Sequence, residues 1–72
     1  MEESEFLSLI GRNITKNRKL KGLTIKEFGY LCDIEKSNLI PIEKGRKNIT
    51  ALTMLKIANA LEIEVKTLFE IQ

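Results

Sequence analysis

The stretch from Thr24 to Glu43, TIKEFGYLCDIEKSNLIPIE, decides how this chain folds. It opens with Thr24 and carries Glu27 three residues later, which is the capping-box pattern that begins a helix. Phe28 and Cys32 then share one face of a short helix expected over residues 25–32. The single cysteine is therefore interpreted as a small buried apolar residue.

The second half of the stretch predicts a sharp turn and another short helix. Asp33 can adopt the left-handed backbone conformation that such a turn requires. Leu39 and Ile42 provide an inner face for a helix over residues 35–42. Pro41 lacks the N–H that would bond a carbonyl one turn back, so it is expected to shorten or kink the end of this helix.

Glycine in a helix interior costs about 1 kcal/mol relative to alanine, so it usually has a packing reason. Gly29 lies in such a position, which indicates a close approach by another helix. A small residue in a first short helix, a tight turn and a second short helix define a helix-turn-helix. The exposed side of the second helix is then free to enter the major groove of DNA.

Three further helices are expected around this unit, over residues 4–20, 51–61 and 65–70. The helix over 4–20 has apolar residues at helical spacing. The apolar stripe of the helix over 51–61 runs through Leu52, Leu55, Ala58 and Leu61, with Met54 and Ile57 beside it. No alternation typical of strands is present. The 72 residues are therefore predicted to form one all-α domain, 1–72, a compact bundle of about five short helices.

The amino-acid composition excludes several classes of function. The chain has no histidine and one cysteine, so it lacks the commonest general acid/base, the usual zinc ligands and a disulfide. An enzyme is not expected, and neither is a cofactor or a metal. No apolar run approaches the roughly 20 residues that span a bilayer, and the acidic N-terminus does not resemble a signal peptide. We expect a cytoplasmic protein.

The net charge of +2 is unevenly distributed. Residues 12–56 carry eleven Lys and Arg against four acidic residues, while residues 1–5 and 62–72 are acidic. A basic middle segment of this kind favours binding to a polyanion such as nucleic acid. A solvated lysine-rich surface is the alternative interpretation.

At this point the chain resembles the phage repressor/Cro-type helix-turn-helix family, also called the xenobiotic-response-element type. The resemblance covers about residues 10–69. It rests on GRNI at 11–14, Arg18 followed by KGLT at 21–24, IEKGR at 42–46, LTMLKIANAL at 52–61 and the final Leu68-Phe69 pair. It implies a five-helix fold, operator DNA as the ligand and binding as a two-fold dimer. Ile25 departs from the pattern, because members of this family usually carry glutamine there.

The resemblance also implies which residues contact DNA. Candidates for reading bases lie on the second helix of the motif, where lysine can donate to guanine and asparagine can pair with adenine. They are Lys36, Ser37, Asn38 and Glu35, and Glu35 would either read a cytosine amino group or pair with Lys36. Candidates for phosphate contacts, which position the protein without reading sequence, are Thr24, Lys26, Lys44, Arg46, Lys47 and Asn48.

Two further predictions concern an ion pair within the fold and a contact between two copies of the chain. Arg18 and Glu43 are expected to form a buried or half-buried ion pair. Leu68, Phe69 and Ile71 exceed what one short helix can bury, so some of them are expected to form a homodimer contact.

The leading hypothesis is a sequence-specific transcriptional regulator, acting as a repressor that binds an inverted-repeat operator as a homodimer. A protein-interaction module, similar to an antitoxin, for which DNA binding is secondary, is the alternative. Phage, restriction–modification and toxin–antitoxin loci all remain open, as does an unidentified protein regulator.

Overall fold

A computed structural model of the chain describes residues 1–71. Over these residues the chain forms four α-helices and one 3₁₀ helix, without strands. Their bounds are α1 (Glu3–Leu20), α2 (Ile25–Cys32), α3 (Lys36–Glu43), α4 (Ala51–Leu61) and η1 (Val65–Phe69). The predicted all-α class and the order of the elements are confirmed, although the last element is a 3₁₀ helix. No helix within this part of the chain is long and apolar enough to span a bilayer.

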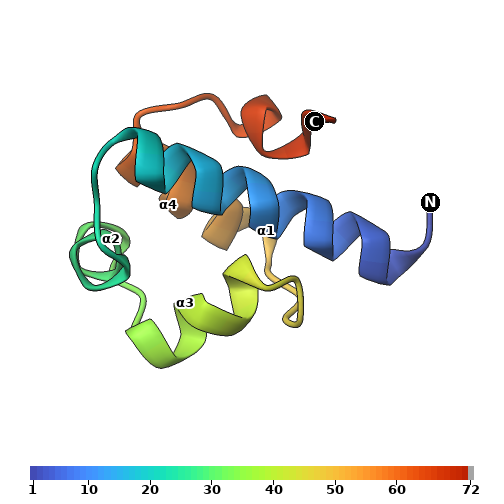
Figure 1. The fold of residues 1–72 in the computed structure, drawn as a ribbon, viewed down its shortest axis with the longest axis horizontal. Helices are drawn as coiled ribbons and strands as arrows, with labels where there is room; N and C mark the ends of the chain where they lie inside the picture. The colour runs from blue at the N-terminus through green and yellow to red at the C-terminus, as the bar shows by residue number, and fades with distance from the viewer. Residues whose placement is uncertain (72) are drawn as a thin grey trace.

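The helices surround one core. In Figure 1, α1 crosses the middle of the molecule, with α3 on one side and the C-terminal η1 on the other, while α2 closes one end. Every element contributes a fully buried side chain: Ile14, Phe28, Leu39, Ile57 and Leu68, in chain order. Most helices shorter than about 12–15 residues are marginal alone, so these short helices depend on this shared core.

The turn between α2 and α3 has the predicted backbone. Asp33 is left-handed, with φ 57° and ψ 44°, and the N–H of Ile34 bonds the Gly29 carbonyl at 3.0 Å. A Cβ atom on Gly29 would lie 2.6 Å from the Ile34 carbonyl oxygen and 3.3 Å from Leu39 Cδ1. The group that approaches Gly29 most closely is therefore the backbone of the turn, and the Leu39 side chain of α3 is the next nearest.

Of the two effects expected of Pro41, a shorter helix or a kink, the shortening does not occur. The helix continues to Glu43, and the N–H of Lys44 still bonds the Ile40 carbonyl at 3.1 Å. Only the hydrogen bond to the Ser37 carbonyl is lost, and because Ser37 is exposed, water can take the donor's place.

The apolar face of α4 differs from the predicted stripe. Leu52 and Leu55 are 73% and 44% exposed, whereas Ile57, Ala58 and Leu61 are buried. Together with the half-buried Met54, the buried residues follow the spacing i, i+3, i+4, i+7 of one helix face. Two apolar stripes overlap in this sequence, and the one that begins at residue 54 faces the core.

The C-terminal segment is attached to α1 by a buried asparagine. Asn13, 2% exposed, donates from Nδ2 to the carbonyls of Leu68 at 2.9 Å and Glu70 at 2.8 Å. Leu68 itself is fully buried in the core, so its assignment to a dimer surface is wrong. Phe69 is 36% exposed and stacks on Phe6, with ring centroids 5.9 Å apart.

Leu68→Ala is expected to lower the free energy of unfolding by about 2–5 kcal/mol, because it leaves a cavity in the core. Leu52→Ala, the same chemical change at an exposed site, is expected to stay within about 0.5 kcal/mol of the parent. Urea unfolding followed by circular dichroism measures both. Equal losses would mean that the assigned faces of α4 and η1 are incorrect.

Candidate nucleic-acid interface

The first turn of α3 presents a row of polar side chains to solvent. Lys36, Ser37 and Asn38 are exposed there, while Leu39 and Ile42 are buried on the inner face. This outer side of α3 therefore has the chemistry for reading base edges, with an ammonium, a hydroxyl and an amide in adjacent positions.

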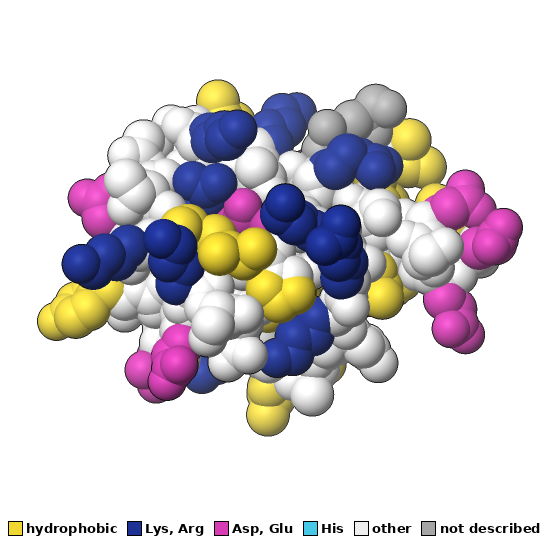
Figure 2. All heavy atoms as spheres, turned by 60° about the horizontal axis from the view of Figure 1, so that its bottom comes forward, with side chains coloured by type: hydrophobic (Ala, Val, Ile, Leu, Met, Phe, Trp, Pro, Cys, Tyr) yellow, Lys and Arg dark blue, Asp and Glu magenta, His cyan; other side chains and the backbone are white. Residues whose placement is uncertain are grey.

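Basic side chains surround this row. Figure 2 turns the α3 side of the molecule forward and shows Lys and Arg side chains spread over that face around a small hydrophobic patch, with most Asp and Glu at its edges. The exposed basic residues of α2, α3 and the following loop are Lys26, Lys36, Lys44, Arg46 and Lys47. Their positive potential is suited to a polyanionic partner.

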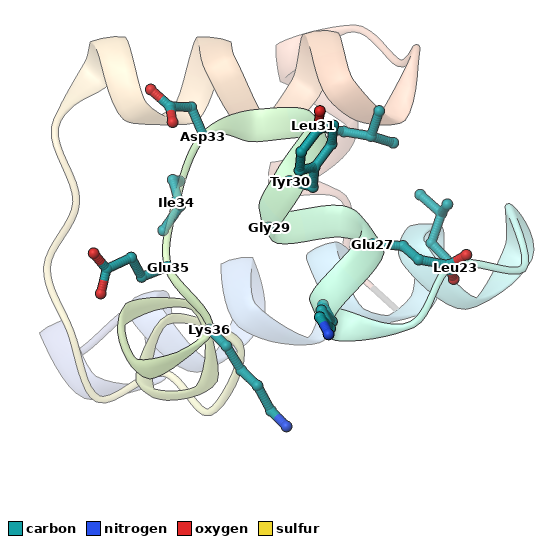
Figure 3. Close-up of a pocket in the computed structure, with 10 residues that line it drawn as sticks. Leu23, Glu27, Gly29, Tyr30, Leu31, Asp33, Ile34, Glu35 and Lys36 are labelled. Atoms are coloured by element: carbon teal, nitrogen blue, oxygen red, sulfur yellow. The ribbon is translucent and has the colours of Figure 1, made fainter.

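Two grooves are lined by residues from both the start of α2 and α3. The first, of about 740 Å³, lies between α2 and the first turn of α3 and is lined by both Lys26 and Lys36. Gly29 and Ile34 also line it (Figure 3). The second, of about 560 Å³, is lined by Thr24 and Lys44. These predicted contact residues of α2 and α3 therefore share one surface.

Ile25 and Ile40, which sequence reasoning did not assign to the site, also line the second groove. Their apolar side chains therefore form part of the lining of a groove that also contains the basic residues Arg18 and Lys44. Ile25 stands at the position where the resemblance seen in the sequence implies a glutamine. Its side chain cannot donate to a phosphate, which leaves only its backbone N–H for that contact.

Glu35 is the N-cap residue of α3, and its side chain makes no capping hydrogen bond. Figure 3 shows the Glu35 and Lys36 side chains pointing away from one another. Among the ion pairs of residues 1–71 none joins them, so of the two alternatives for Glu35 the pairing with Lys36 is not formed. The Glu35 carboxylate instead faces solvent beside the exposed row of Lys36, Ser37 and Asn38.

The loop after α3 folds back onto the helix. The N–H of Arg46 bonds the Pro41 carbonyl at 2.9 Å, and Gly45 is left-handed with φ 71°. Lys47 Nζ then donates to Asn38 Oδ1 at 2.9 Å. Nothing in the sequence indicated this contact, because it depends on the path of the loop. Arg46 and Asn48 are exposed on either side of Lys47.

An ion pair at the C-terminal end of α3 positions the helix. Arg18 of α1 donates from Nε to Glu43 Oε2 at 2.8 Å and from Nη2 to Oε1 at 3.1 Å. The side chains are only 13% and 8% exposed. The predicted bidentate pair is therefore present. Arg18 also donates from Nη1 to the Leu23 carbonyl at 2.9 Å, and the Thr15 hydroxyl donates to Glu43 at 2.9 Å.

Three groups among residues 1–71 have shifted pKa values, and one of them is Glu62, whose pKa is lowered by its hydrogen bond with Lys21. The backbone N–H and the hydroxyl of Thr24 both hydrogen-bond Glu27 and lower the pKa of that carboxyl, as the capping box implies. Burial raises the pKa of the Cys32 thiol, which is 3% exposed and acts as a core residue, as predicted. Within residues 1–71 no cluster of three or more potential metal ligands is present.

Comparison with known proteins shows to which family of proteins the chain belongs. The profile of the helix-turn-helix family HTH_3 matches residues 14–68. The chain belongs to this Cro/C1-type helix-turn-helix family, whose members are DNA-binding transcription regulators and not enzymes. The matched residues include α2, the Asp33 turn and α3.

Individual relatives agree with the family. An uncharacterised HTH-type transcriptional regulator, y4dJ of Sinorhizobium fredii, is 34% identical over 55 residues, which are 76% of this chain and 71% of that protein. The restriction–modification controller protein C.AhdI from Aeromonas hydrophila is 32% identical, with a TM-score of 0.84 over 88% of this chain and 96% of its own. An HTH_3 regulator from Vibrio cholerae is 31% identical with a TM-score of 0.88, over 94% of this chain but 38% of that chain.

Arg18→Ala is expected to lower the free energy of unfolding by about 3 kcal/mol, because it leaves Glu43 poorly solvated and unpaired. Lys21→Ala, which breaks the exposed pair between Lys21 and Glu62, should cost less than about 1 kcal/mol. Thermal and urea unfolding of both variants provide the measurement. An Arg18→Ala protein as stable as Lys21→Ala would show that the pair contributes little.

Proposed function

We propose that this transcriptional regulator is a repressor that binds an inverted-repeat operator as a homodimer, with α3 in the major groove. The observation that carries the proposal is the exposed row of Lys36, Ser37 and Asn38 on α3, flanked by basic residues from α2 and the following loop. A domain bound in this way blocks other proteins from the same DNA without any additional contact, which favours repression.

Base reading is assigned to the first turn of α3. Lys36 donates to guanine O6 and N7, and Ser37 and Asn38 add hydrogen bonds beside it. Glu35 accepts from a cytosine amino group, because its carboxylate is exposed and makes no capping bond. A carboxylate so placed repels phosphates, so it directs the approach of the protein toward base edges.

Phosphate contacts are assigned to the start of α2 and to the loop after α3. The N–H of Thr24 is already bound by Glu27, and its hydroxyl accepts from the N–H of Glu27. The N–H groups of Ile25 and Lys26 therefore receive the phosphate at this helix end. Further phosphate contacts come from the side chains of Lys26, Lys44, Arg46, Lys47 and Asn48.

A homodimer is assigned to the apolar side chains beside the termini. Ile71 is 82% exposed and lines a shallow hollow with Met1, and Phe69 lies nearby in sequence with its ring against Phe6. Figure 1 places this C-terminal segment across α1 from α3. Pairing two copies there leaves both α3 helices available to DNA, with half-site centres about one helical turn, ~34 Å, apart.

A second candidate function, a protein-interaction module, is favoured by the exposed Leu52 and Leu55 of α4. The two functions differ in their response to salt. Neutralising phosphates releases counterions, so a DNA-binding protein loses affinity steeply as salt rises. Binding to duplex DNA without such a slope would favour the protein-interaction function.

Lys36→Ala and Arg46→Ala are expected to weaken DNA binding in different ways. Loss of Lys36 should cost about 1–3 kcal/mol on the operator and little on scrambled duplex, because a base contact is lost. Loss of Arg46 should weaken both duplexes equally and reduce the salt slope by about one phosphate contact. Binding isotherms on both duplexes at two salt concentrations separate these outcomes. Equal weakening by Lys36→Ala would place Lys36 on the backbone.

Ile71→Glu is expected to shift the protein toward monomer and to weaken operator binding, since it puts a charge into the apolar contact. Tyr30→Glu, at an 88% exposed site on α2, should leave the association state unchanged. Sedimentation velocity with and without operator DNA measures both. A wild-type protein that is monomeric even on its best operator would contradict the homodimer.

A further inference from the structure

We infer that Lys47 and Asn38 act as one donor pair that selects guanine over adenine, an inference that rests on the proposed base reading by α3. The observation is the hydrogen bond from Lys47 Nζ to Asn38 Oδ1 at 2.9 Å. It joins a residue of the loop to a residue of the base-reading row, nine positions apart.

The loop that carries Lys47 is held against the rest of the fold. Backbone hydrogen bonds run from Gly45 to Ile42 at 3.1 Å and from Arg46 to Pro41 at 2.9 Å. A Cβ on Gly45 would lie 2.6 Å from Ser8 Cα, so the loop also packs closely on α1. The Lys47 side chain therefore extends toward Asn38 from a loop whose backbone is held in place by these contacts.

A side-chain amide alone reads adenine well. Its oxygen accepts from the N6 amino group while its nitrogen donates to N7. Here the ammonium of Lys47 occupies one side of Asn38 Oδ1. An amide oxygen has a second lone pair, but an adenine amino group that approached it would meet the lysine ammonium, donor against donor.

Guanine presents the opposite pattern in the major groove, because its O6 and N7 are both acceptors. Asn38 Nδ2 can donate to one of them, and the N–H groups that Lys47 retains after binding Oδ1 can donate to the other. The ammonium thereby changes the amide from an adenine reader to part of a guanine reader. This arrangement assigns Lys47 to base reading in place of the phosphate contact proposed for it, whereas its neighbour Arg46 stays a phosphate contact.

The test begins with an operator selected from random duplexes by the wild-type protein. The base pair read by Asn38 is the one at which Asn38→Ala loses its preference. Wild-type protein and the Lys47→Met and Arg46→Met variants are then titrated with duplexes that carry guanine or adenine at that position. Both variants remove one positive charge from the same exposed loop, so they are matched in electrostatics.

Wild-type protein is expected to prefer guanine by roughly tenfold or more. Lys47→Met should lose most of this preference or shift it to adenine, and combining it with Asn38→Ala should give a non-additive loss. Arg46→Met should weaken both duplexes by the same factor. If wild-type protein selects adenine, or if Lys47→Met keeps the guanine preference, only this inference is overturned. If wild-type protein binds every duplex equally, the proposed base reading fails with it.

Discussion

Arg18 joins three segments of the chain through a single side chain. Its guanidinium donates to the Glu43 carboxylate at the end of α3 and to the Leu23 carbonyl just before α2, while its backbone belongs to α1. Because α3 has only eight residues, its intrinsic stability is low and its direction depends on such contacts. The guanidinium suits this role, since it offers several donors in a fixed planar arrangement.

Glycines set how closely the helices around α3 approach. At one end the Glu43 carbonyl lies against Gly11 of α1, where any Cβ would overlap it. At the other end the Ile34 carbonyl lies against Gly29. These contacts place α3 relative to α1 and α2, so the grooves that bring Lys26 beside Lys36 and Thr24 beside Lys44 depend on the absence of two side chains.

Sequence reasoning succeeded where the determinant was local. The capping box of Thr24 and the left-handed Asp33 were predictable because each depends on a few consecutive residues. The buried face of α4 was not predictable, because α4 carries two overlapping apolar stripes. Only the packing of the other helices determines which stripe is buried. The Asn13 bonds to the C-terminal carbonyls were also missed, since an asparagine in a helix gives no sign of a partner 55 residues away.

The proposed recognition surface concentrates its chemistry in the first turn of α3. Pro41 takes a later position of α3 and offers no polar group, so in the proposed binding mode base reading falls to the residues before Leu39. A reader this short has few hydrogen bonds to distribute, and each change in a single donor alters a large share of its selectivity. A loop lysine that engages Asn38 therefore has more influence here than it would beside a longer helix. Evolution of the loop alone, with α3 unchanged, is then a route to a different operator.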